Sequence, residues 1–307
     1  WQIQIFLNVF SVVLGFILLT RLEFNWRRFG LAVLLGIIAT YSFANGLAYW
    51  ALGFAGLVLL PFKARRVKFL ALAGWAAATA AILFSYLWRF HYDAPSGKPW
   101  TYFLEQPVKY LGYILKYLGA AIINYEDYAL VFGLLGLLLF AGMTIAVLRK
   151  GKEWRRPLLP FLLFGLYALG CAMLTGIGRV AFGSVQAMSY RYVTFSNLIW
   201  VADFLFLYIL SQEIRRQSKP RLRRGISAAA VSILIFVLLF GIARTSYRVG
   251  HRVLKSYHAR LSEARSELLR GEDKTLLLRL YIDADYVRQG IETLRKHKLS
   301  VFRPKGR

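Results

Sequence analysis

The sequence predicts an all-α fold, a polytopic transmembrane helical bundle with an outer-face interfacial helix and a small C-terminal helical appendage. The 307-residue chain is 58% hydrophobic and has a mean hydropathy of +0.48, which exceeds the roughly half-apolar composition of soluble domains. Its apolar residues form runs of about 16–22, the length that crosses about 30 Å of hydrocarbon as a helix. The runs are continuous rather than alternating, which argues against a transmembrane barrel.

The apolar runs predict about eight crossings within residues 1–243. We place them at residues 3–20, 29–44, 46–62, 69–88, 128–148, 157–176, 195–211 and 225–243. The second and third belong to one apolar stretch, 29–62, which is too long for a single span. The segment Ser42–Leu47 contains the turn signal Asn45-Gly46 and is expected to break this stretch into a hairpin.

Four basic connections predict the orientation. They hold 18 lysines and arginines and cover residues 21–28, 63–68, 149–156 and 215–224. With the hairpin broken in two, all four fall on one side of the membrane, which the positive-inside rule assigns to the cytoplasm. Both termini of this chain, and the segments 89–127 and 177–194, are then expected on the outer face.

The net charge of +25 has an explanation in this class of protein. Basic residues report topology and contact anionic phospholipids, so we expect no nucleic-acid partner. The one cysteine, Cys171, lies in an apolar run, and no Cys/His ligand spacing occurs, so no metal site is expected. Nucleotide-binding and hydrolase motifs are also missing from the sequence, and no cofactor is expected.

Two segments outside the spans are predicted to be helical. In 107–123, tyrosines 110, 113 and 117 and lysines 109 and 116 give an amphipathic pattern. This predicts an interfacial helix on the outer surface, with a re-entrant helix as the alternative. The region 244–307 has 16 basic and 7 acidic residues and apolar residues at three- and four-residue steps, which predicts a basic helical region on the outer face.

A polar, hydrogen-bonding segment between two apolar runs is Gly178–Asn197. It contains Arg179 and Arg191 and no acidic residue. Two arginines without carboxylate partners at a membrane surface suit a phosphate group, which the guanidinium fork binds through paired hydrogen bonds. The candidate phosphate-binding set comprises Arg191, Arg179, Tyr192, Ser189, Gln186 and Asn45. The alternative is that the arginines contact ordinary lipid phosphates.

Acidic residues supply the other candidates. Asp203 is the one acid inside a predicted span, where it is expected to serve a polar pocket or a proton site, or to hydrogen-bond another helix. On the outer side, Asp93, Glu126 and Asp127 are weak candidates for a catalytic base, which would have to be a carboxylate near that surface. The catalytic residue is not identified by the sequence.

Four stretches resemble the C-terminal part of a bacterial group of polytopic membrane proteins, the GT-C-type glycosyltransferases of surface polysaccharide or glycolipid assembly. They are "WQIQIF" at 1–6, "ATYSFANGLAYWALG" at 39–53, "SYRYVTFSNLIW" at 189–200 and "LRLYIDADYVRQGIETLRKHKLSVF" at 278–302. The resemblance implies sugar transfer from a polyprenyl-phosphate carrier on the outer face of the inner membrane. The catalytic aspartate of such enzymes usually lies in the first outer loop, so we expect it in an upstream segment or partner subunit.

Glycosyl transfer from a lipid-linked sugar to a surface glycan or lipid is therefore the expected function. Two alternatives stay open at this point. A transporter or flippase of lipid-linked saccharides would need polar residues spread through several spans. A non-catalytic membrane subunit would not need polar residues in its spans.

Overall fold

The computed structural model describes residues 2–21, 24–88, 104–150, 152–217 and 284–298, together with isolated positions between 240 and 263. Contacts divide the chain into two units, Trp1–Ile242 and Ala243–Arg307. Regular structure in the described residues is helical, and no strand occurs among them. The first unit contains α1 (Gln2–Thr20), α2 (Trp26–Ser42), η1 (Ala44–Gly46), α3 (Leu47–Leu59), α4 (Arg65–Leu87), α6 (Pro107–Gly119), α7 (Glu126–Lys150), α8 (Lys152–Arg179), η2 (Val180–Phe182), η3 (Ser184–Met188) and α9 (Tyr190–Gln217).

Five described helices are long and apolar enough to cross a membrane. The candidate spans are Ile3–Thr20, Arg65–Leu87, Glu126–Ala146, Pro157–Phe182 and Tyr190–Ile209. Large apolar side chains on their outward faces are exposed, including Phe69 and Phe84 of α4 and Leu138 of α7, as lipid-facing positions would be. The chain is a multi-pass membrane protein with the expected all-α polytopic fold. The predicted crossing at 225–243 lies mostly outside the described residues.

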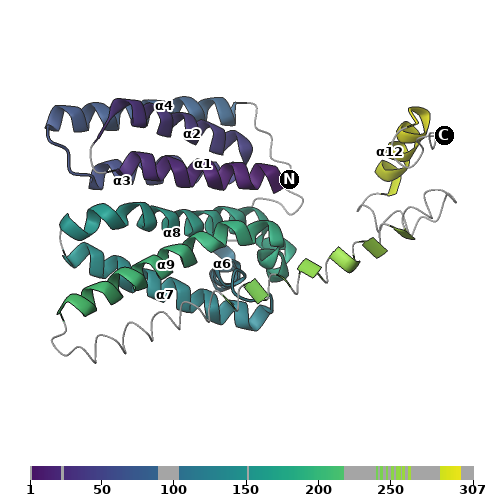
Figure 1. Ribbon diagram of the computed structural model, residues 1–307. Helices are drawn as coiled ribbons and strands as arrows, with labels where there is room; N and C mark the ends of the chain where they lie inside the picture. Colours follow the sequence, from purple (N-terminus) through teal and green to yellow (C-terminus); the bar gives the residue numbers. More distant parts are fainter. Residues whose placement is uncertain are drawn as a thin grey trace, which may run out of the picture. The chain divides into compact units, whose positions relative to one another are not determined.

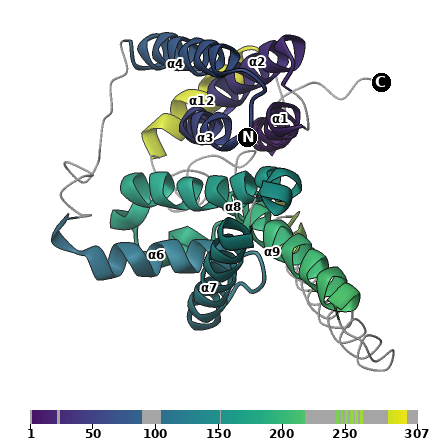
Figure 2. The same cartoon turned by 90° about the vertical axis from the view of Figure 1, so that its left-hand side faces the viewer.

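In the first unit, α8 lies between two groups of helices (Figure 1, Figure 2). On one side it packs against α1 and α3, which in turn contact α2 and α4. On the other side it packs against α6, α7 and α9. Aromatic side chains join the first group to α8. The Phe16 ring stacks on Tyr49 with ring centroids 4.7 Å apart and lies edge-on to Tyr167 at 6.3 Å.

The apolar stretch 29–62 forms the broken hairpin that its length predicts, with α2 and α3 joined at η1. However, α3 has 13 residues, about 20 Å of helix, which is shorter than the apolar core of a membrane. Asn45 and Gly46 at the turn are buried, and the turn packs against α2 and α8. The hairpin returns the chain to the end of the bundle at which α2 begins (Figure 1), as the charge argument requires.

Helix α1 supplies polar groups to this buried turn. Asn8 Nδ2 donates hydrogen bonds to the carbonyl oxygens of Ala39 at 2.7 Å and Phe43 at 3.3 Å. The Asn8 carbonyl oxygen accepts one from the Tyr167 hydroxyl at 2.7 Å. The end of a helix exposes carbonyl groups, and inside a membrane only protein groups can satisfy them. Asn8 therefore links α1, the end of α2 and α8 at the depth of the turn.

Helix α6 runs across the direction of its neighbours. Figure 1 shows it nearly end-on, and Figure 2 shows it lengthwise. It begins at Pro107, a favourable residue for a first helical turn because that turn needs no backbone donor. Its aromatic face is not exposed to lipid: Tyr113 and Tyr117 are fully buried, and the Tyr110 hydroxyl donates to the Met173 carbonyl at 2.7 Å. The interfacial helix is therefore docked on the protein.

The packing of α6 on α7 brings the two backbones together. A Cβ atom added to Gly133 would lie 1.8 Å from the carbonyl oxygen of Leu115, and one added to Gly119 would lie 1.8 Å from that of Ala129. Only glycine permits this approach. The Trp200 indole of α9 also donates to the Leu118 carbonyl at 3.0 Å. These contacts fix the position of α6 at one end of the bundle, called here the α6 end.

The second unit contains α12 (Ala284–Lys296). It lies within the region 244–307, which the sequence predicts to be basic and helical. Ile291 and Leu294 are its half-buried positions, whereas Glu292 and Thr293 are exposed, so the expected apolar face is the less exposed one.

Candidate functional site

The α6 end of the bundle contains helix ends that the sequence predicts to be on the outer face. α8 ends there, α7 and α9 begin there, and the start of α1 lies at the same end (Figure 1). Between α8 and α9 the chain forms the short helices η2 and η3, separated by Gly183. Gly183 has φ 95°, a conformation that residues with a Cβ rarely adopt. This turn aims the η3 segment back over α6.

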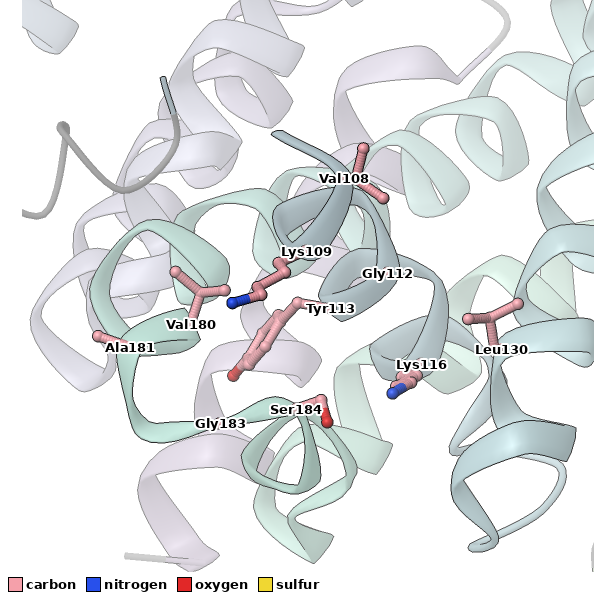
Figure 3. A pocket seen from close by; sticks show the side chains of 10 residues that line it. All are labelled: Val108, Lys109, Gly112, Tyr113, Lys116, Leu130, Val180, Ala181, Gly183 and Ser184. Carbon is pink, nitrogen blue, oxygen red and sulfur yellow. The ribbon is translucent and has the colours of Figure 1, made fainter. Parts of the chain in front are cut away.

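A pocket of about 470 Å³ lies between α6 and this turn. Its lining residues are Val108, Lys109, Gly112, Tyr113, Lys116, Leu130, Val180, Ala181, Gly183 and Ser184. Figure 3 shows two groups of polar atoms around it. The Lys109 ammonium and the Tyr113 hydroxyl lie on one side, and the Lys116 ammonium and the Ser184 hydroxyl lie on the other.

The Tyr113 hydroxyl is the most unusual of these groups. The side chain is fully buried, and its oxygen has no hydrogen-bond partner within the described part of the chain. A buried polar group without a partner costs free energy, so such a group in a pocket wall marks a place where a ligand or water can bind.

Both arginines of the polar loop act on this hydroxyl. Burial raises the pKa of Tyr113 above its ordinary value, and so does the neighbouring Tyr192, whereas the positive charges of Arg179 and Arg191 lower it. The two guanidinium groups are therefore close enough to influence the same atom, although they are far apart in sequence. The two predicted phosphate-binding arginines thus act on Tyr113, although neither is among the residues that line the pocket.

Arg191 is held by an aromatic stack. Its guanidinium carbon lies 4.9 Å from the centre of the Tyr192 ring, and the Tyr192 ring stacks on Tyr117 of α6 with centroids 5.4 Å apart. Arg191 Nε is buried and, among the described residues, lacks a hydrogen-bond partner. Arg179 is more exposed, and its guanidinium lies 5.5 Å from the Phe182 ring. Cation–π contacts orient both side chains but leave hydrogen-bond donors for a ligand.

The carboxylate of Glu126 lies beside the pocket. Lys116 Nζ forms an ion pair with Glu126 Oε1 at 2.5 Å, and the Ser184 hydroxyl donates to the same oxygen. A carboxylate engaged in this way is not free to take a proton from another group. The adjacent Asp127 is exposed, and Asp93 lies outside the described residues. The geometry does not single out one of these three acids as a base.

The remaining predicted residues lie elsewhere. Ser189 and Gln186 are half-buried, and their backbone groups stabilise the η3 turn, where Ser189 N donates to the Gln186 carbonyl at 3.2 Å. Asn45 is buried in the hairpin turn inside the bundle. Asp203 is fully buried, roughly three and a half turns into α9. Neither of its carboxylate oxygens bonds to a group in the described residues, so the expected hydrogen bond to another helix is not formed there.

Sequence reasoning missed the contribution of α6 to this site. Lys109, Tyr113 and Lys116 belong to the amphipathic pattern that predicts an interfacial helix, and that pattern alone does not predict a pocket. Their spacing of four and three residues does place them on one side of a helix. That signal would have indicated a shared site if the surface on which α6 docks had been known.

Comparison of the chain with protein-family models, with curated proteins and with solved structures gives no match.

Proposed function

We propose that the chain binds the phosphate of a lipid-linked sugar at the α6 end and takes part in glycosyl transfer from that donor. The proposed setting is the outer face of a bacterial inner membrane, and the proposed acceptor is a surface glycan or lipid. The observation that carries the proposal is the pocket itself, which Lys109 and Tyr113 line. The Tyr113 hydroxyl is buried without a partner among the described residues, and the charges of Arg179 and Arg191, which are not lining residues, act on it.

The chemistry of these groups favours a phosphate. Lysine and arginine supply charge-assisted hydrogen bonds, and the planar guanidinium matches two phosphate oxygens at once. The tyrosine hydroxyl adds a neutral donor. Apart from Glu126, which is occupied by Lys116 and Ser184, the described carboxylates do not contact this group of cations. A bound anion would therefore meet an excess of positive charge.

The surroundings of the pocket favour a lipid over a soluble phosphate. Leu130 of α7 lines the pocket, and Leu134 and Leu138 follow at four-residue steps on the same face of that helix. Both are exposed, at 42% and 60%, and lie within the candidate span Glu126–Ala146. An isoprenoid chain attached to the phosphate could follow this apolar strip into the membrane.

In the proposed reaction, an acceptor hydroxyl oxygen forms a bond to the anomeric carbon of the sugar. The bond between that carbon and the donor phosphate oxygen breaks, and the phosphate leaves with the bonding electrons, while the hydroxyl proton passes to a base. The pocket cations would stabilise the negative charge that develops on the leaving phosphate, and fixed charges placed in this way lower the barrier of many enzymatic reactions. This is the role that we assign to Arg191, Arg179 and Lys109.

The test is binding of a fluorescent polyprenyl monophosphate by the full chain in nanodiscs. Arg191→Lys keeps the charge but loses the fork, and should weaken binding by about 1–3 kcal/mol, which is roughly 5- to 150-fold in Kd. Arg66→Lys is the matched control, because Arg66 is an exposed arginine in the basic connection 63–68. Equal affinities for the two variants would contradict the proposal.

Turnover of the sugar-loaded donor separates the enzyme from its alternatives. Transfer to an acceptor by the full chain, alone or with an upstream segment, supports the glycosyltransferase. Binding without transfer, but with movement of the lipid between leaflets, would support a flippase. Binding with neither would support a non-catalytic subunit.

A further inference from the structure

The polar groups of the pocket lie on two sides, called here the first and the second place, and at the second place the protein itself supplies an anion. The first place is lined by Tyr113 and Lys109, and the charges of the two loop arginines act on the Tyr113 hydroxyl from outside the lining. The second is formed by Lys116 and Ser184, which lie on the other side of the pocket in Figure 3. In the second place the anion is the Glu126 carboxylate, which receives the ion pair from Lys116 and the hydrogen bond from Ser184.

A carboxylate oxygen and a phosphate oxygen make the same demands on their partners. Each accepts charge-assisted hydrogen bonds from an ammonium and ordinary ones from a hydroxyl. The Glu126 carboxylate therefore stands where a phosphate oxygen could bind. Its exposure allows it to leave: its side chain is 38% exposed, whereas that of Lys116 is 15% exposed. A carboxylate that moves from this position into water is hydrated there, so its displacement costs about the worth of the charged hydrogen bond that it leaves.

We propose that Glu126 is an internal anion that closes the second place, and that a ligand with two adjacent phosphate groups displaces it. A monophosphate can be satisfied by Tyr113, Lys109 and the arginines, and it leaves the Lys116–Glu126 pair intact. A diphosphate places a second phosphate toward Lys116 and Ser184 and releases Glu126. The inference rests on the proposed function and names its donor class, a lipid-linked diphosphate sugar.

The consequence can be measured as a change in the ratio of two affinities, one for a polyprenyl diphosphate and one for a polyprenyl monophosphate. Glu126→Gln keeps the size of the side chain and its ability to hydrogen-bond, but removes the negative charge that competes for Lys116. This variant should bind a polyprenyl diphosphate about tenfold more tightly than the unmodified chain, the worth of one charged hydrogen bond. Its affinity for a polyprenyl monophosphate should change by less than about threefold, because the other partners are untouched.

Two further variants control the experiment. Asp127→Asn removes the same charge one residue away, from an exposed side chain, and should leave the ratio of the two affinities unchanged. Lys116→Gln removes the cation of the second place and should weaken diphosphate binding while sparing monophosphate binding. Inorganic pyrophosphate, used as a competitor, distinguishes recognition of the phosphates from recognition of the lipid.

The outcomes separate this inference from the proposed function. Binding of both lipids by the unmodified chain, with the selectivity shift confined to Glu126→Gln, supports both. Binding of both lipids without that shift, or with an equal shift in Asp127→Asn, overturns only the internal-anion inference. Weaker diphosphate binding by Glu126→Gln would instead make Glu126 a residue that orients Lys116, and failure of the unmodified chain to bind either lipid would overturn both proposals.

Discussion

Substituting Gly133 by alanine is the most informative structural perturbation, because it acts on the pocket without touching it. A Cβ at this position would lie 1.8 Å from the Leu115 carbonyl oxygen. The obstacle is backbone, which no side-chain rotation can move. α6 and α7 would have to separate by roughly 1.5 Å to reach ordinary van der Waals contact, and overpacking of this kind costs about 1–3 kcal/mol.

The expected result is a lower thermal midpoint of unfolding and weaker ligand binding in the pocket. At about 2–4 °C of Tm per kcal/mol for a protein of this size, Gly133→Ala should lose several degrees in detergent. Because Lys109, Tyr113 and Lys116 all lie on α6, binding of a polyprenyl phosphate should weaken in parallel, even though Gly133 is not a lining residue.

Gly142→Ala is the matched control on the same helix. A Cβ there meets nothing within 4 Å, and replacing glycine by alanine in a helix interior is favourable by about 0.5–1 kcal/mol. Its Tm should stay the same or rise. Equal stability and equal binding for the two variants would refute the close packing of α6 on α7 and, with it, the position of the pocket.

Three other predictions concern the hairpin turn, the buried acid and the orientation in the membrane. Asn8→Leu removes the side chain that donates to the Ala39 carbonyl and should lower Tm by several degrees, since a lost buried hydrogen bond costs about 1–3 kcal/mol; an unchanged Tm would show that backbone donors alone satisfy the hairpin turn. Asp203→Asn should leave Tm within about 2 °C, because neither carboxylate oxygen has a partner in the described residues and so no hydrogen bond is lost; a clear drop would reveal a partner. Val185→Cys should react with a membrane-impermeant thiol reagent from outside intact cells and Arg66→Cys should not, both side chains being exposed; the reverse pattern would place the pocket in the cytoplasm.

The helical membrane class and the broken hairpin could be predicted because they depend on local pattern and on charge. The lengths of the apolar runs can be read from the sequence alone. So can the two basic connections that flank residues 29–62, which require an even number of membrane crossings between them. The depth of the hairpin turn could not be predicted, because it depends on Asn8 and Tyr167, which meet the turn from other helices. No pattern of residue spacing along the chain predicts that these two side chains contact the hairpin turn.

The candidate site was predictable in part for the same reason. Arg179 and Arg191 are conspicuous because they are basic residues in a polar loop between apolar runs. Lys116 and Tyr113 are not, since an amphipathic helix with aromatic residues looks the same whether it lies on lipid or docks on protein. Tertiary contacts decide whether such a helix lies on lipid or docks on protein. One of them is the close approach of the α6 and α7 backbones at Gly119 and Gly133, which depends on the three-dimensional arrangement of the two helices.

The most direct measurement of phosphate binding at the α6 end is a structure of the full chain in nanodiscs with a polyprenyl phosphate bound. We predict phosphate density in the pocket between α6 and the η2–η3 turn. One of its oxygens should lie within hydrogen-bond distance of the Tyr113 hydroxyl, with the Arg191 and Arg179 guanidinium groups turned toward it. Phosphate density elsewhere on the protein, with Tyr113 still without a partner, would contradict the proposed site.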